Sequence, residues 1–254
     1  MEEIKINVPG VTSTYEILRR KALQLIFNDK DLQHREFTAA PLTPEAAIGR
    51  SSCCDYVLLK GKERLLQAEI DGFVGQAFTD RPGYYQGQLN NVFNFPLEDN
   101  FERAVFISFL NALLRRQDVI QKSMHCRDES PAHCALLLSE HIKKVFEPGK
   151  VVLIGYQPRF AETLADSFAL RINDLDPDNL GKTIKGAAGV SIESSAASEE
   201  NMEWGDLVVV TGSSIINNTF PSFNLSNKPV LFFGTSIAGP AQVLGLNHFC
   251  PLSF

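Results

Sequence analysis

The second half of this chain holds short, almost wholly apolar runs that each end in small polar residues. The longer runs cover residues 151–154, 206–210 and 229–233, and a shorter one covers residues 170–172. Their length and composition are typical of strands that are buried on both faces of a parallel sheet. Helical patterns stand between them. Strand, turn and helix in this order predict right-handed βαβ units, and therefore a doubly wound, mostly parallel sheet.

The first half of the chain follows a different pattern. Apolar residues at helical spacing predict helices over residues 13–29, 99–116 and 130–146. Residues 56–59 and 65–70 are predicted to pair as a hairpin that turns at the glycine between them. Strands followed by helices indicate an α+β domain.

A proline and a glycine separate the two halves. Pro148 and Gly149 cannot continue the helix before them, so we expect the boundary within residues 146–150. The sequence thus predicts an α/β chain in which a smaller α+β domain, residues 1–148, precedes a Rossmann-like domain, residues 149–254.

The composition narrows the classes of partner. The formal net charge is −6 and no run of Lys or Arg exceeds three residues, which argues against nucleic acid and anionic membranes as partners. No window approaches the roughly 20 apolar residues that span a bilayer, so no membrane insertion is expected. Five cysteines in a chain without an export signal argue for reduced thiols and a cytoplasmic protein. Association into an oligomer is compatible with these features.

The predicted strands of the second half end in residues that suit ligand binding. Because parallel strands end at the same edge of a sheet, these turns are expected to share one crevice. Any one of them could be only a turn, but four together favour a site for a small ligand. The candidates are Gly155, Tyr156, Asp174, Asp176, Thr211, Gly212, Ser213, Gly234 and Thr235.

One spacing resembles that of a dinucleotide site. Asp174 follows Gly155 by 19 residues. In dinucleotide-binding sequences the first glycine of the glycine-rich loop and the acid that binds the ribose have a similar spacing. The loop after Gly155 lacks the other two glycines, so NAD is not expected, whereas an adenosine-type or smaller ligand is compatible. We expect Asp174 to end the second strand, face the crevice and contribute little to stability.

Two histidines and two cysteines lie within residues 125–134. Imidazole and thiolate are ligands that zinc, copper and other heavy metals prefer, so a heavy-metal or divalent transition-metal ion is a candidate cofactor. The spacing is not C-x-x-C, and adjacent His-Cys pairs rarely bind one ion, so His125 and Cys126 are either metal ligands or structural residues. Cys134 falls on the apolar stripe of a helix and is expected in the core. Cys53 and Cys54, beside the predicted hairpin, are expected to be packing residues.

No residue is singled out as catalytic. Glu69, Asp71 and Asp80 lie near the predicted hairpin and could transfer protons, although charged residues beside a glycine-rich turn are more often simply solvated.

Several strings resemble the family named "putative heavy-metal chelation". They are Gly155-Tyr-Gln-Pro158, Asp174-Leu-Asp176, Trp204-Gly-Asp206, the segment from Val210 to Thr219 and the segment from Gly234 to Gly239, with His125-Cys126 and Pro131-x-x-Cys134 in the first half. The resemblance implies a first domain like the enolase N-terminal domain, packed on a Rossmann-like domain with a site in the cleft between them. It also implies which residues face that cleft, namely Asp174, Thr211, Gly212, Asn217 and Thr219.

Two functions from different classes follow. The first is a binding or handling protein for a metal ion or a metal-chelating small molecule. The second is an enzyme that acts on a nucleotide-like or cofactor-precursor molecule. In either case we expect His125 and Cys126 to meet Asn217 and Thr219 in one composite site.

Overall fold

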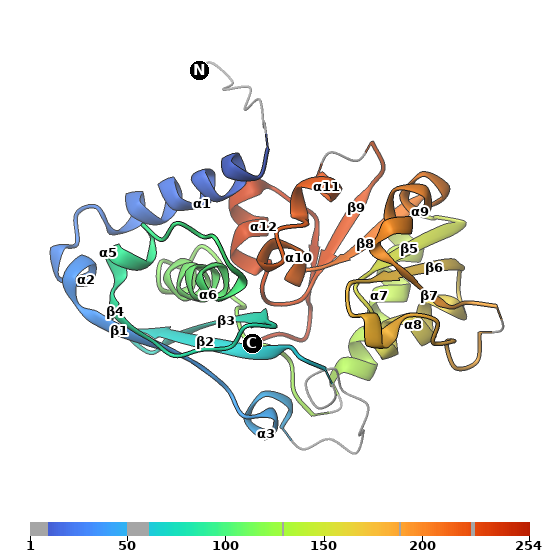
Figure 1. Ribbon diagram of the computed structural model, residues 1–254, viewed down its shortest axis with the longest axis horizontal. Coiled ribbons are helices and arrows are strands. Elements are labelled where there is room, and N and C mark those ends of the chain that lie inside the picture. The colour runs from blue at the N-terminus through green and yellow to red at the C-terminus, as the bar shows by residue number, and fades with distance from the viewer. Residues whose placement is uncertain (1–9, 50–60, 129, 188, 225–226) are drawn as a thin grey trace.

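The computed structural model describes residues 10–49, 61–128, 130–187, 189–224 and 227–254. The chain forms two sheets with helices packed between and around them (Figure 1). The antiparallel sheet has the order β3-β2-β1-β4, from the strands β1 (Glu36–Pro41), β2 (Arg64–Ile70), β3 (Phe73–Thr79) and β4 (Tyr85–Gln88).

The second sheet is parallel throughout and has the order β10-β9-β8-β5-β6-β7. If β5 is numbered 1 and the sheet is followed from its β7 edge to its β10 edge, the strand order is 3-2-1-4-5-6. This is the order of a doubly wound sheet, whose ligand crevice lies at the carboxyl ends of the strands. The strands are β5 (Lys150–Ile154), β6 (Ala169–Asp174), β7 (Ile192–Ser194), β8 (Leu207–Thr211), β9 (Val230–Phe233) and β10 (His248–Phe249).

Alternate residues of the parallel strands enter two different cores. Val152 and Val208 pack toward the first half of the chain, whereas their neighbours Val151 and Leu207 pack toward the opposite face. This alternation explains why the strands are apolar at every position. Helices α7 (Ser130–Val145) and α8 (Pro158–Ala165) cover the second face, and α9 (Ser198–Trp204) and α12 (Ala238–Leu244) lie on the first.

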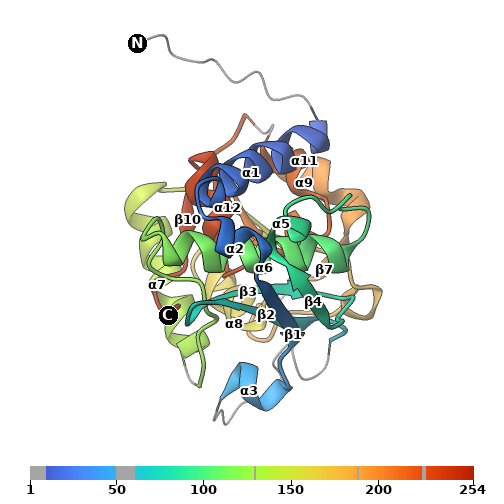
Figure 2. The ribbon, with the colours of Figure 1, turned by 90° about the vertical axis from the view of Figure 1, so that its left-hand side faces the viewer.

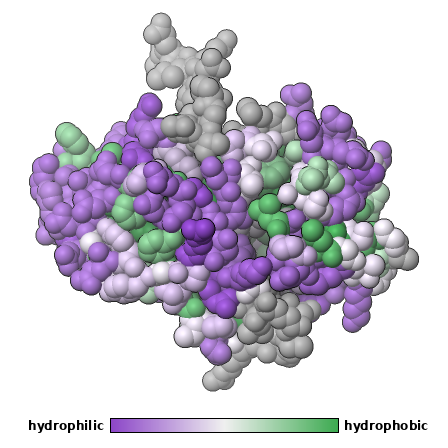
Figure 3. Space-filling view, viewed as in Figure 1, coloured by the Kyte–Doolittle hydropathy of each residue, from purple (hydrophilic) through white to green (hydrophobic). Residues whose placement is uncertain are grey.

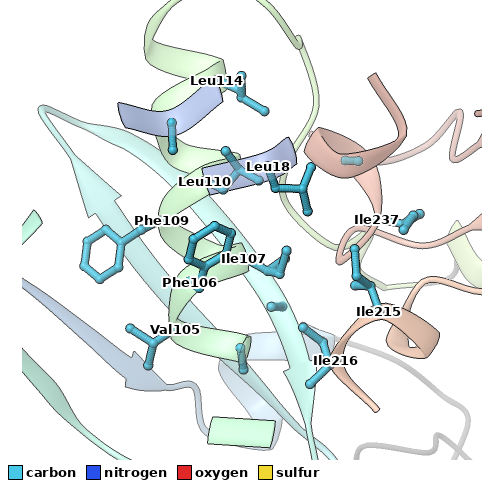
Figure 4. Close-up of a cluster of buried hydrophobic side chains, with 14 of the residues drawn as sticks. Leu18, Val105, Phe106, Ile107, Phe109, Leu110, Leu114, Ile215, Ile216 and Ile237 are labelled. Carbon is cyan, nitrogen blue, oxygen red and sulfur yellow. The ribbon is translucent and has the colours of Figure 1, made fainter. Parts of the chain in front are cut away.

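Helix α6 (Asn100–Arg116) lies at the centre of the first core. It is buried from Arg103 to Leu114, and it packs between the antiparallel sheet and the helices α1 (Gly10–Ile26) and α12 (Figure 2). Figure 4 shows Ile107 of α6 directed toward Ile215 and Ile216, which belong to the short helix α10 (Ser213–Ile216) after β8. One hydrophobic core therefore joins the two halves of the chain.

Helix α6 approaches strand β3 so closely that no side chain fits between them. A Cβ atom at Gly75 would lie 2.1 Å from the carbonyl oxygen of Ser108 and 2.3 Å from the amide nitrogen of Ala112. Only glycine allows this contact, which sets the distance between α6 and the sheet.

A buried amide fixes the antiparallel sheet to the end of β9. The Nδ2 atom of Asn111 donates to the carbonyl of Gln76 at 3.0 Å and to that of Thr235 at 3.1 Å. Its Oδ1 atom accepts from the amide of Gly239 at 2.8 Å. Nearby, the backbone N–H of Phe78 donates to the hydroxyl of Ser236 at 2.9 Å. These bonds hold the first half of the chain over the carboxyl ends of the parallel strands.

The fold class predicted from the sequence is confirmed as a parallel α/β sheet with a separate antiparallel sheet. The predicted helices over residues 99–116 and 130–146 are α6 and α7. The predicted hairpin is corrected, because β2 pairs with β3 on one side and with β1 on the other. Both edges of β2 are occupied, and residues 56–59 lie outside the described part of the chain.

The remaining helical segments are short connections. They are α2 (Lys30–His34), α3 (Pro44–Ile48), α5 (Leu89–Val92), α11 (Phe220–Asn224) and the single turns Pro177–Asn179 and Ser195–Ala197. Across the described residues, we find no helix that has both the length and the apolar character needed to cross a membrane.

Candidate functional site

A cavity of about 980 Å³ opens at the carboxyl ends of the parallel strands. One wall consists of the turns that follow β5, β6, β8, β9 and β10, and the opposite wall comes from the first half of the chain. The face shown in Figure 3 is mostly hydrophilic, with hydrophobic residues gathered to the right of its middle. The contributors from the first half include Glu63, Phe78, Asp80, Asn100, His125, Cys126 and Cys134.

The structure brings most of the residues singled out in the sequence to this cavity. Thr235 instead lies behind the wall, where it is 1% exposed and its carbonyl accepts from Asn111. The residues on the wall are Gly155, Tyr156, Asp174, Asp176, Thr211, Gly212, Ser213, Asn217, Thr219 and Gly234, together with His125 and Cys126.

Gly155 makes the turn at the end of β5. Its φ of +89° lies in the left-handed region that favours glycine, and a Cβ atom there would lie 2.4 Å from Cγ2 of Thr211. The turn is therefore both sharp and close to the neighbouring strand end. This brings the backbone of the β5 turn next to β8 at the position where the strand order reverses.

Asp174 ends β6 and connects two loops. Its Oδ2 atom accepts from the amide of Tyr156 at 2.6 Å, and its Oδ1 atom accepts from the amide of Asp176 at 2.8 Å and from Nδ2 of Asn179 at 3.2 Å. The carboxylate lines the cavity, and its three hydrogen bonds argue for a larger contribution to stability than the sequence led us to expect. A group with three hydrogen bonds holds both loops in place.

The β5 turn is poorly suited to a pyrophosphate. In a dinucleotide site the free N–H groups of this turn bind the phosphates. Here the N–H of Tyr156 donates to Asp174, and that of Phe160 donates to Oε1 of Gln157 at 2.6 Å. The side chains of Asp174 and Gln157 already occupy these donors, which agrees with the missing glycines of the sequence.

Glu63 lies at the centre of an acidic part of the wall. Burial is the main cause that raises the pKa of its carboxyl group to about 7; the nearby carboxylates of Asp174, Asp80 and Asp176 contribute to the rise, and a hydrogen bond from Ser213 opposes it. We call these four carboxylates, Glu63, Asp80, Asp174 and Asp176, the acidic end of the cavity.

Positive charge at this end is limited. Of the described residues that line the cavity, five are Asp or Glu and two are Lys or Arg. Lys62 forms ion pairs with Asp176 at 3.7 Å and Asp178 at 3.8 Å, and Arg159 forms one with Glu162 at 2.8 Å. Negative charge is therefore in excess on the wall.

A buried arginine positions two polar groups beside the acidic end. Arg103 donates to Oδ1 of Asn100 at 2.6 Å and to the carbonyl of Ile216 at 2.7 Å. Asn100 in turn donates to Oδ1 of Asp80 at 2.7 Å and to Oδ1 of Asn217 at 3.4 Å. The first half of the chain thereby orients groups from both walls.

Three thiols line another part of the cavity. Cys126 precedes α7, Cys134 lies in its second turn, and Cys250 follows β10. All three are free, and each interacts electrostatically with the others. Burial raises the pKa of Cys126 and of Cys134 to about 12, and it raises that of Cys250 as well. The thiols are therefore protonated at neutral pH.

His125 lies beside these thiols and is neutral. Burial lowers the pKa of its imidazole to about 4, partly offset by a hydrogen bond to the backbone of Ala47. Its ring contacts that of Phe78 edge to face, with centroids 5.3 Å apart, and its Nδ1 atom is buried without a hydrogen-bond partner among the described residues. We call His125, Cys126, Cys134, Phe249 and Cys250 the thiol end.

The side chains present do not form a coordination sphere as they stand. Within the described part of the chain, no three His, Cys, Asp or Glu side chains are placed to hold a metal ion. Cys53 and Cys54 lie outside that part.

The three acids near the predicted hairpin have different positions. Asp71 accepts from Arg35 at 2.6 Å and from Arg116 at 2.7 Å, so it forms a surface ion-pair network, and Glu69 is exposed on β2. Asp80 alone reaches the cavity. Sequence reasoning missed Glu63, Asn100 and Cys250, because long-range packing brings each of them to the strand ends and no local pattern marks them.

Three comparisons place the chain among known proteins. Residues 138–237 match the model of a family described as "Putative heavy-metal chelation", DUF364. Curated proteins yield no match.

Two solved structures, both described as proteins with unknown function from the DUF364 family, share the fold. The protein from Pyrococcus horikoshii superimposes with a TM-score of 0.52 at 11% identity, over 88% of this chain and 79% of its own. The protein from Desulfitobacterium hafniense does so with a TM-score of 0.52 at 14% identity, over 91% of this chain and 84% of its own. The chain is thus similar in fold to members of the DUF364 family, and its residues 138–237 are similar to that family in sequence.

Proposed function

We propose that this protein binds a small polar ligand that carries positive charge, in the cavity between its two halves. The observation that carries the proposal is the surplus of carboxylates around Glu63. Four carboxylates converge there, and the two cations on the same wall do not balance them: Lys62 pairs with one of the four, Asp176, and Arg159 pairs with Glu162 outside the group. Like charges brought together out of water repel one another, and a cation among them removes that cost.

The size of the cavity favours a molecule over a bare ion. A volume of about 980 Å³ is at the upper end of the range for small-molecule pockets, which is roughly 300–1,000 Å³. The description of the family that residues 138–237 match names heavy-metal chelation, so a metal is one candidate for part of the ligand. Because the described side chains form no coordination sphere, a metal ion would fit this cavity best inside a complex that supplies its own ligands.

A pair of coordination complexes tests the charge preference. We expect hexaamminecobalt(III) to bind the purified protein saturably, with one site by calorimetry, and hexacyanocobaltate(III), which is similar in shape but anionic, not to bind. Glu63→Gln removes a charge from the acidic end and is expected to lower the affinity for hexaamminecobalt(III) about tenfold.

Glu69→Gln is the matched control. Glu69 lies exposed on strand β2, which directly follows Glu63, and it is outside the cavity, so its substitution also removes one carboxyl group but leaves the wall intact. Equal effects of the two variants would show that the cation binds the surface at large. Binding of the anionic complex would overturn the proposal.

A second candidate is an enzyme, and one contact favours it. Glu63 accepts a hydrogen bond from Ser213, and a carboxyl group with a pKa of about 7 can both take up and release a proton near neutral pH. Native mass spectrometry of the purified protein identifies any retained organic molecule. A mass change of that molecule on incubation with the protein, lost in Glu63→Gln, would establish turnover.

A further inference from the structure

The two ends of the cavity lie far apart along the edge of the parallel sheet. Asp174 ends β6 and Asp176 follows it, whereas Phe249 ends β10 and Cys250 follows it. Strands β5, β8 and β9 lie between them, so on this wall four strand spacings of about 4.8 Å separate the acids from Phe249 and Cys250 by roughly 19 Å. The carboxylates that interact electrostatically with Glu63 all belong to the acidic end, and the three thiols interact electrostatically with one another.

The thiol end is uncharged. Its cysteines are protonated and its histidine is neutral at pH 7, for the reasons of burial given above. Lys122 lies nearby, and its ammonium group donates to the carbonyl of Pro251 at the surface. A protonated thiol behaves as a small apolar side chain.

Aromatic side chains extend this apolar character. The rings of Phe160 and Phe233 lie 4.8 Å apart, and Phe249 packs on the ring of His141 at 4.8 Å. Phe160, Phe233 and Phe249 all line the cavity, together with Phe78 and Pro131.

A buried hydroxyl lies on the wall between the two ends. Ser214 is 2% exposed, lines the cavity after β8, and its Oγ atom has no hydrogen-bond partner among the described residues. Buried hydroxyls are nearly always paired, so an orphan on a cavity wall points to a polar group that arrives with a ligand.

We infer that the ligand is an amphipathic organic cation, whose charged group lies at the acidic end and whose apolar body extends toward the thiol end. The inference rests on the proposed function and adds the nature of the ligand's body. An extended molecule of this kind fits a cavity that is anionic on one side and, on the other, uncharged and lined mostly by thiols and aromatic rings.

A series of linear alkylammonium ions from butyl to decyl tests the inference on the intact protein. Each methylene that enters the thiol end leaves water, so the association constant should rise about two- to fourfold per methylene until the cavity is filled. Alkyl carboxylates of the same lengths are the control for non-specific apolar binding. Calorimetry below the micelle-forming concentrations gives both sets of constants.

Two variants separate the ends. Phe249→Ser should reduce the gain in association constant per methylene, with its largest effect on the longest chains. Glu63→Gln should instead lower the association constant of every alkylammonium ion by a similar factor. Phe254→Ser is the matched control, because the Phe254 side chain is 53% exposed and outside the cavity.

The failures of the two proposals are distinguishable. If hexaamminecobalt(III) and butylammonium bind but longer chains gain nothing in the wild-type protein, the amphipathic ligand is refuted and the proposed cation site stands. If neither cation binds, both proposals fall. Equal gains for ammonium and carboxylate chains would reduce the site to an apolar pocket and would also refute the inference.

Discussion

At the scale of single residues, Glu63 shows what a sequence conceals. It follows a glycine and a lysine and resembles any solvated turn residue. Its environment comes from Asp174 and Ser213, which lie more than 100 positions away in the chain. Asp174, in contrast, could be predicted, because the end of an apolar strand is a local pattern. Residues whose role depends on their own strand are readable in the sequence, and residues placed by the other half of the chain are not.

The stability of the protein should depend on pH through Glu63. The pKa of Glu63 is about 7 in the folded protein, against an ordinary value of 4.5. The folded state thus holds the Glu63 proton more tightly than the unfolded state does. The contribution of this proton to stability is complete below about pH 4.5 and is lost as the pH rises through 7. We compare the free energies of unfolding of Glu63→Gln and wild type. Their difference should shift in favour of the variant by about 1–3 kcal/mol from pH 5 to pH 8, a range that allows for solvent screening.

Urea unfolding of both proteins at pH 5 and pH 8 measures this gain. His125 has the opposite effect, because burial lowers its pKa to about 4 and acid therefore destabilises the fold. It is present in both proteins and cancels in their difference. A difference that is the same at both pH values would contradict the prediction.

At the scale of elements, the sequence reveals the strands that are buried on both faces. Strands β5, β8 and β9 consist almost wholly of apolar residues and were predicted within one or two residues. The edge strands β7 and β10 were not predicted, because three or two residues carry too little pattern. The partners of β2 were also beyond prediction, since pairing across the sheet depends on contacts distant in sequence.

The loops after β5 and β6 should behave as one unit that Asp174 holds together. Asp174→Ala removes the acceptor of three hydrogen bonds, so we expect a loss of about 1–3 kcal/mol in stability. Hydrogen exchange should accelerate at the amides of Tyr156 and Asp176 together, while the amides of β8 stay protected. Acceleration across the whole sheet, or no loss of stability, would contradict the shared role of the carboxylate.

At the scale of the whole molecule, the cavity exists only because the two halves share a core. Val152, Ile154 and Phe232 of the parallel sheet pack in one cluster with Phe106 and Leu110 of α6. Helix α7, although it precedes the proposed boundary at residue 148, packs on the other face of the same sheet. We therefore propose that residues 1–148 and 149–254 are architectural units that fold together.

A single substitution in the first half should destabilise the second half equally. Gly75→Ala places a Cβ atom about 2 Å from backbone atoms of α6, all within the first half, and should lower the stability by about 3 kcal/mol or more.

The sole tryptophan, Trp204, reports on the second half, where it packs beside Arg171. If the shared core couples the halves, the Trp204 fluorescence midpoint in urea falls by as much as the far-ultraviolet circular dichroism midpoint. Gly149→Ala, whose nearest neighbour would be 3.4 Å away, should move neither appreciably. An unchanged Trp204 transition in Gly75→Ala would show that the second half folds independently, and that the cavity is a junction between two separable domains.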